Sequence, residues 1–169
     1  MNNKNIRNYQ IFSMIFTFIL GTFLHFTYNL SNQNQIVALF SAINESVWEH
    51  LKLLYFPMLI TLIIGYLIYG KTFPNFVCAK TIGMLIAMVF TVIFHYTYTG
   101  IIGKHIAVID IGSFFVATII GEYVSYKLIS SMFKCKDKVW IFILIIFFIC
   151  FTIFTYFPLN LAIFKPPFI

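Results

Sequence analysis

The chain has 169 residues, of which 61% are hydrophobic and only 9% are charged. A soluble domain carries roughly a quarter charged residues, so this composition excludes a soluble enzyme, a disordered chain and a small secreted disulfide-rich domain. The net charge of +6 comes from basic residues between long apolar runs. That pattern favours membrane lipids as partners and argues against nucleic acid.

Five apolar segments have about the 20 residues that a helix needs to cross the hydrocarbon of a bilayer. Their length and their lack of alternating polarity favour α-helices. We therefore predict an all-α, polytopic integral membrane protein, with residues 1–169 forming a single transmembrane domain. The predicted spans are residues 11–28, 46–69, 77–98, 106–127 and 139–157.

A short apolar segment, residues 36–43, lies before the second span. Eight residues are too few to cross the membrane. We expect this segment to lie in the interface or to re-enter the membrane beside the helices.

The basic residues predict how the chain is oriented. With the N-terminus in the cytoplasm, eight lysines and arginines lie on the cytoplasmic side and three lie outside. Cytoplasmic loops carry the excess of basic residues in membrane proteins. We therefore predict a multi-pass plasma-membrane protein with a cytoplasmic N-terminus and an extracytoplasmic C-terminus.

The three cysteines, Cys78, Cys135 and Cys150, form no C-x-x-C pair and have no zinc-ligand spacing. They lie in apolar or cytoplasm-facing segments. Their odd number and these positions predict free thiols and argue against a disulfide framework.

Ionisable residues concentrate at one end of the predicted spans. Seven of the nine histidines, aspartates and glutamates lie at or near an outer end. A rise of about 1.5 Å per residue places His25, His50, His95 and Asp110 roughly 5–7 Å below that end, each on a different span. Because ionisable groups inside a membrane are costly and usually functional, we expect a polar chamber that opens outward.

These four residues are the candidate metal ligands. His25, His50 and His95 supply three imidazoles for zinc or another divalent metal, and Asp110 is a fourth ligand or orients a histidine. No two histidines have the spacing of an H-E-x-x-H motif. The alternative is a polar network that holds the helices in register.

Candidates for catalysis and substrate binding lie nearby. Glu49 and Glu45 are candidate acid–base groups, and Ser46 is a third catalytic candidate. Lys52 and Tyr98 are candidates for binding a substrate head group. The structural alternative is that Ser46 and Glu49 form a capping box, while Lys52 pairs with one of the glutamates.

Glu122 and Lys80 lie near the opposite end of their spans. We expect an ion pair between them. If Glu122 were instead accessible, it would provide the second half of a proton or ion path across the membrane.

The string N-E-S-V-W-E-H-L-K at residues 44–52 resembles the signature of a family of small bacterial integral membrane proteins that contain a domain of unknown function. His25, the tyrosine-rich end of the third span and the Asp110-Ile111 pair are also similar to that family's pattern. The resemblance covers most of the chain. It implies a five-span membrane fold and no particular activity.

Ser46-x3-His50 is similar to the Ser-x3-His element of the alkaline-ceramidase and progestin-receptor-like superfamily. Those proteins are seven-span zinc hydrolases embedded in the membrane. The likeness implies hydrolytic zinc chemistry. This chain has five predicted spans and lacks the superfamily's His-x3-His pair.

Three functions fit the sequence. The first is a metal-dependent hydrolase that acts on a lipid or another amphiphile at a site open to the outer leaflet. The second is a small ion, proton or solute transporter, and the third is a structural or accessory subunit. The oligomeric state does not follow from the sequence.

Overall fold

The computed structural model describes residues 3–131 and 134–166, and these residues contain helices and no β-strand. Five of the helices are long and apolar enough to cross a membrane, which confirms the all-helical architecture and the number of candidate spans. The elements are α1 (Asn3–Leu30), α2 (Gln35–Ala38), α3 (Val47–Tyr69), α4 (Phe76–Ile102), α5 (Ala107–Ser130), α6 (Asp137–Tyr156) and the short 3-10 helix η1 (Ala162–Phe164).

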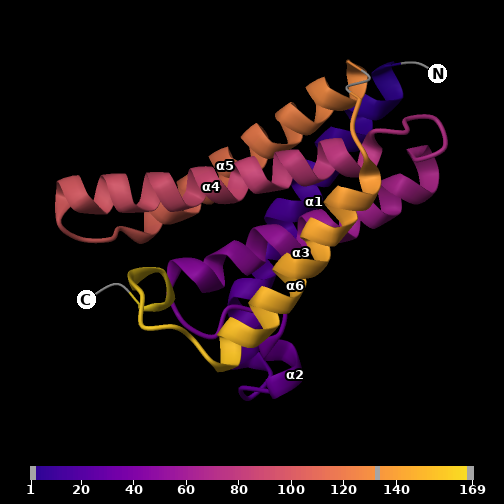
Figure 1. Ribbon diagram of the computed structural model, residues 1–169. Helices are drawn as coiled ribbons and strands as arrows, with labels where there is room; N and C mark the ends of the chain where they lie inside the picture. The colour runs from indigo at the N-terminus through magenta and orange to yellow at the C-terminus, as the bar shows by residue number, and fades with distance from the viewer. Residues whose placement is uncertain (1–2, 132–133, 167–169) are drawn as a thin grey trace.

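The five long helices alternate in direction, so the bundle has two distinct ends (Figure 1). We call the end that holds Cys78 and Cys135 the disulfide end, and the end that holds His25 and His50 the histidine end. Helices α3 and α4 are mostly buried, whereas α1, α5 and α6 expose many apolar side chains. Such a ring of exposed isoleucine and phenylalanine suits contact with lipid.

Helix α4 lies against α5 as a long hairpin (Figure 1). The two backbones approach closely at Gly83 and Gly121, because a Cβ added at Gly83 would collide with the carbonyl oxygen of Gly121. Small residues permit this kind of helix contact in membranes. The hairpin therefore depends on glycine at this level.

Helices α1 and α4 extend furthest beyond their predicted bounds. Helix α1 begins at Asn3 because Ile6 and Tyr9 are buried against aromatic side chains of α3 and α4. Helix α4 continues to Ile102 and ends at Gly103, whose φ of 81° is a left-handed conformation that glycine adopts without strain.

The short segment before α3 folds back against the ends of α1 and α3. Only the single turn α2 is helical, and Ala38 and Ser41 are buried. The Tyr28 amide donates to the Ser41 hydroxyl at 3.0 Å. The Lys52 ammonium donates to the Ala38 carbonyl at 2.8 Å. These contacts fix the chain that leads into α3.

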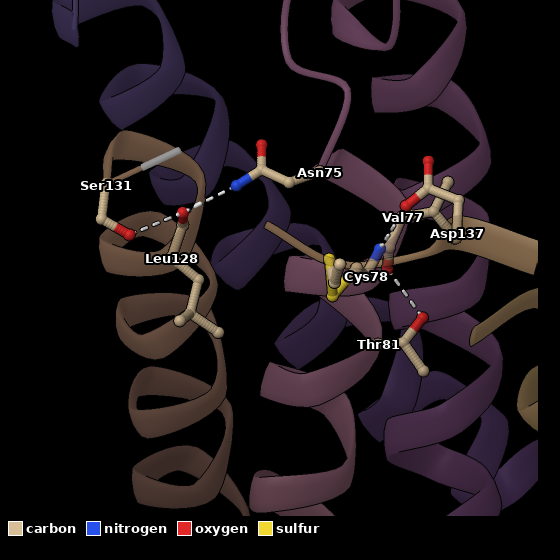
Figure 2. Close-up of a disulfide and its surroundings, with 8 residues drawn as sticks. Asn75, Val77, Cys78, Thr81, Leu128, Ser131 and Asp137 are labelled. Atoms are coloured by element: carbon tan, nitrogen blue, oxygen red, sulfur yellow. Dashed lines mark hydrogen bonds between the residues drawn. A yellow bond between two sulfur atoms is a disulfide. The ribbon is translucent and has the colours of Figure 1, made fainter. Parts of the chain in front are cut away.

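Cys78 and Cys135 form a disulfide, so the prediction of free thiols is wrong for these two residues (Figure 2). Helix α5 returns the chain to the start of α4, which brings together residues 57 positions apart. Cys150 is a free cysteine. Spacing along the chain could not reveal this pair, because it depends on the helical hairpin between the two residues.

Candidate functional site

A cavity of about 380 Å³ lies at the histidine end, between α1, α3, α4 and α5. The four predicted metal ligands, His25, His50, His95 and Asp110, all line it, together with His105. Polar groups that are as much as 85 residues apart in the chain therefore meet in one volume. The geometry places them together as expected, while their chemical roles stay a prediction.

Three of the lining side chains form a compact triangle of metal-ligand atoms. One atom from each of His25, Glu45 and His50 lies within 4.8 Å of the others. The two histidine Nε2 atoms are 3.3 Å apart. The Glu45 Oε2 atom lies 3.6 Å from the Nε2 of His25 and 3.4 Å from that of His50.

Two of these separations, 3.3 and 3.4 Å, equal those of neighbouring ligands in a tetrahedral zinc site, and the third, 3.6 Å, is slightly longer. Zinc binds imidazole nitrogen at about 2.0–2.1 Å, so neighbouring ligands of a tetrahedral site lie about 3.3–3.4 Å apart. Three protein ligands would leave the fourth position open, as in catalytic zinc sites. The triangle lies on the wall of the cavity, so the open position of a metal held there would face the cavity.

Local contacts orient the His50 ring for this role. Its Nδ1 lies 2.9 Å from the Ser46 carbonyl oxygen, which can only accept a hydrogen bond. Nδ1 therefore carries a proton, and Nε2 faces His25 and Glu45. Without a metal, Nε2 can donate to the Glu45 carboxylate, and loss of this second proton would turn a lone pair toward a metal at the same place. A backbone carbonyl that fixes the tautomer in this way is typical of metal-binding histidines.

Glu45 precedes α3 and is half-exposed. Its hydrogen bond with His50 lowers the pKa of Glu45, which outweighs the opposite effect of partial burial. The side chain is thus held as a carboxylate. An ionised carboxylate suits a metal ligand better than a proton donor.

A second polar group in the cavity is centred on Asp110. Its Oδ1 lies 3.2 Å from the Nδ1 of His95 and accepts a hydrogen bond from the Tyr98 hydroxyl. The Nδ1 of His105 is 3.7 Å from Oδ2. Tyr98 also accepts a hydrogen bond from the Ile106 amide at 3.2 Å, so its hydroxyl is committed to positioning Asp110.

Tyr98 is not among the residues that line the cavity, and three more predicted catalytic or binding residues also lie outside it. Glu49 and Lys52 form a buried ion pair at 2.6 Å on another side of α3. The Thr155 hydroxyl of α6 donates to Glu49 at 3.2 Å and accepts from Lys52 at 2.9 Å. Ser46 is the N-cap of α3 and accepts a hydrogen bond from the Glu49 amide. The predicted ion pair therefore accounts for Lys52 and Glu49, and Ser46 caps the helix. The full capping box is not formed, because the Ser46 amide donates to Asn44 and the Glu49 carboxylate accepts from the Ile43 amide.

The expected Lys80–Glu122 ion pair is confirmed, at 2.6 Å and with both side chains buried. The Ser13 hydroxyl donates to Glu122 at 2.7 Å and accepts from Lys80 at 2.9 Å. The pair lies in the half of the bundle nearer the disulfide end and does not line the histidine cavity.

Two of the residues that line the cavity, Glu45 and His105, lie outside the helices. Helix α3 begins at Val47, so Glu45 precedes it and turns toward His25, whereas Glu49 lies within the helix and points elsewhere. The sequence indicated no role for His105, and the structure places it among the lining side chains. The capping serine at position 46 was the signal that Glu45 precedes the helix.

The rest of the lining is largely apolar and comes from α1 and α5. Phe18 and Phe26 belong to α1, and Ile111 and Phe114 belong to α5. Phe26 and Ile111 are also 56% and 60% exposed on the outer surface of the bundle. The apolar wall of the cavity thus continues onto the surface that would face lipid.

A family model described as a family of unknown function, DUF6512, matches residues 1–168. None of the curated proteins and none of the solved structures gives a significant match. Because the family model covers nearly the whole chain, the protein belongs to the DUF6512 family.

Proposed function

We propose that this protein is a membrane-embedded, metal-dependent hydrolase that acts on a lipid or another amphiphile. The observation that carries the proposal is the triangle of His25, Glu45 and His50 on the wall of a partly apolar cavity. Its donor separations suit zinc, and its open side faces space that a substrate can fill.

The geometry favours different roles from those assigned by sequence. His25, His50 and Glu45 are the metal ligands in this proposal. A bound zinc would act as a Lewis acid and lower the pKa of a coordinated water. His95 moves the proton, because Asp110 holds its Nδ1 and leaves Nε2 free for acid–base work.

The lining favours an amphiphilic substrate. An apolar chain could lie against Phe26 and Ile111 and enter from the lipid, while its polar group meets the histidines. The predicted orientation would open this site to the outer leaflet. The Ser46-x3-His50 likeness to membrane zinc hydrolases agrees with this chemistry, although Ser46 serves here as a helix cap.

The transporter alternative needs polar access from both ends of the bundle. Glu122 and Lys80, which would supply the second access, are fully engaged with each other and with Ser13. The accessory-subunit alternative would need a charged surface for a partner at the start of α3, but Lys52 is completely buried there. The hydrolase proposal, in contrast, needs only side chains that already line the cavity.

The proposal can be tested with vesicles made from a bacterial total lipid extract. Zinc-loaded protein is reconstituted into the vesicles, and mass spectrometry follows every lipid species over time. We expect at least one lipid class to be converted to a hydrolysis product. Chelation of the metal should stop the conversion.

The His50→Ala variant is the control, because it removes one ligand and leaves the buried pairs intact. It should fold and show no lipid conversion. A wild-type protein that binds zinc but changes the lipids no more than His50→Ala would contradict the hydrolase. Conversion that is equal in both proteins would contradict the assigned site.

A further inference from the structure

Figure 2 shows the Cys78–Cys135 disulfide and its surroundings. The disulfide lies at the start of α4 and before α6, which is the end of the bundle opposite the histidine cavity. The excess of lysine and arginine at this end favours a cytoplasmic location. Disulfides in the cytosol are usually transient, catalytic or redox-sensing, because dithiol reductants keep cytosolic thiols reduced. A disulfide at this end therefore calls for a reversible role.

We propose that Cys78 and Cys135 form a redox-exchanging pair that a soluble dithiol reductant of the thioredoxin class opens. The pair is a modification site independent of the hydrolase proposal. Its chemistry follows from the different environments of the two sulfur atoms.

Cys135 is the accessible half of the pair. It is partly exposed in the connection before α6, whereas Cys78 is completely buried. Exposed Lys134 and Lys136 flank Cys135 and attract an anionic thiolate. The incoming thiolate of the reductant therefore attacks the sulfur of Cys135.

Cys78 is the leaving group. It is the third residue of α4, and the N-terminal turn of a helix stabilises a thiolate. Asn75 makes no side-chain cap there. Asp137 opposes the leaving thiolate, because its carboxylate already accepts a hydrogen bond from the Cys78 amide at 3.3 Å (Figure 2).

The exchange balances without any further reactant. The attack forms a mixed disulfide between Cys135 and the reductant and releases the Cys78 thiolate, which takes up a proton. The second thiol of the reductant then attacks its own half of the mixed disulfide and frees Cys135. Two electrons and two protons pass from the reductant to the pair, and the reductant leaves as a disulfide.

Opening the pair would release only one attachment of α6. At its other end, Thr155 contacts the Glu49–Lys52 pair. The Tyr156 hydroxyl donates to the Gln35 carbonyl at 2.6 Å. Reduction should therefore loosen the start of α6 and leave the histidine end in place.

The test begins with purified protein carrying Cys150→Ser, so that only the pair contributes thiols. Thioredoxin, thioredoxin reductase and NADPH are added, and maleimide-polyethylene-glycol labelling counts free thiols over time. We expect two labels per chain. The Lys134→Gln/Lys136→Gln variant should react at least about threefold more slowly at low salt, and this difference should disappear at high salt.

Two matched variants complete the experiment. Lys104→Gln changes an exposed lysine at the histidine end and should leave the rate unchanged. Asp137→Asn removes the charge that opposes the leaving thiolate and should raise the rate. A pair that dithiothreitol opens but the thioredoxin system does not would overturn the proposal.

The same labelling is applied to membranes from growing bacteria that are quenched with acid. We expect mostly reduced pairs in growing cells, oxidation after treatment with diamide, and recovery when diamide is removed. A pair that stays oxidised in growing cells would show a static extracytoplasmic disulfide. That result would contradict both the exchange and the predicted orientation.

Discussion

The Lys80–Glu122 pair and the histidine cavity both place ionisable groups inside a bundle of apolar helices, but their surroundings differ. Lys80 and Glu122 satisfy each other and Ser13, and neither is exposed. The cavity groups are partly exposed and turn several imidazole nitrogens toward open space. Burial of a charge inside a membrane protein therefore does not by itself mark a functional site. A functional site also needs polar atoms that are not already engaged in hydrogen bonds or ion pairs within the protein.

Removing the cation of the buried Lys80–Glu122 pair should have the strongest effect on stability. Lys80→Met leaves the Glu122 carboxylate buried without its cation, which should reduce the free energy of unfolding by about 3 to 5 kcal/mol. Thermal unfolding in detergent measures this loss. The Lys80→Met/Glu122→Leu variant should recover most of it, because no buried charge is left over. A single variant as stable as an exposed Lys71→Met control would contradict the structural role.

Glu49→Gln tests whether the second buried ion pair, Glu49–Lys52, is structural like the Lys80–Glu122 pair. The amide keeps the shape of the side chain but loses its charge attraction to Lys52, so stability should fall by about 2 kcal/mol. Zinc binding and lipid conversion by the folded variant should not change. Loss of activity without loss of stability would return Glu49 to the acid–base role that the sequence suggested.

His95→Gln sharpens the division of labour inside the cavity. If His95 moves protons, the rate of lipid conversion should fall by about 100-fold while zinc binding is retained. Asp110→Asn should also lower the rate of lipid conversion, because Asp110 orients the His95 ring. Lipid conversion and bound zinc are measured for both variants. A variant without zinc would identify His95 as a ligand, as the sequence interpretation had it.

The smallest effect concerns Glu45 in the metal-free protein. Because His50 lowers the pKa of Glu45, its charged form adds stability above the usual carboxyl pKa, and this stability is lost as pH falls through the lowered value. Between about pH 5 and pH 3, the wild type should lose more stability than Glu45→Gln. The difference should stay below about 1 kcal/mol, since the side chain is 60% exposed. Equal acid sensitivity in thermal melts would contradict the contact.

Much of the fold followed from residue periodicity and length. Hydrophobic runs located all five long helices, and counting the helical rise placed His25, His50, His95 and Asp110 at one level. The depth of a residue along its helix depends only on its distance in sequence from the end of the helix, so the sequence predicts it. Opposite charges at one level likewise predicted the Lys80–Glu122 pair.

The rest depended on rotation about the helix axes and on local capping, which spacing alone does not fix. Whether Glu45 or Glu49 faces the cavity depends on where α3 begins, and the cap at Ser46 decides that. The Cys78–Cys135 disulfide depends on how far α5 returns beside α4. His105 gave no signal, because its loop position is typical of exposed residues.

Zinc titration of purified wild type beside His50→Ala decides whether His25, Glu45 and His50 form a metal site. We expect one zinc per chain, bound by two histidine nitrogens and one carboxylate oxygen in X-ray absorption spectra, and affinity at least about 100-fold weaker in His50→Ala. Identical titrations of the two proteins, or zinc bound through other ligands, would contradict the proposed site.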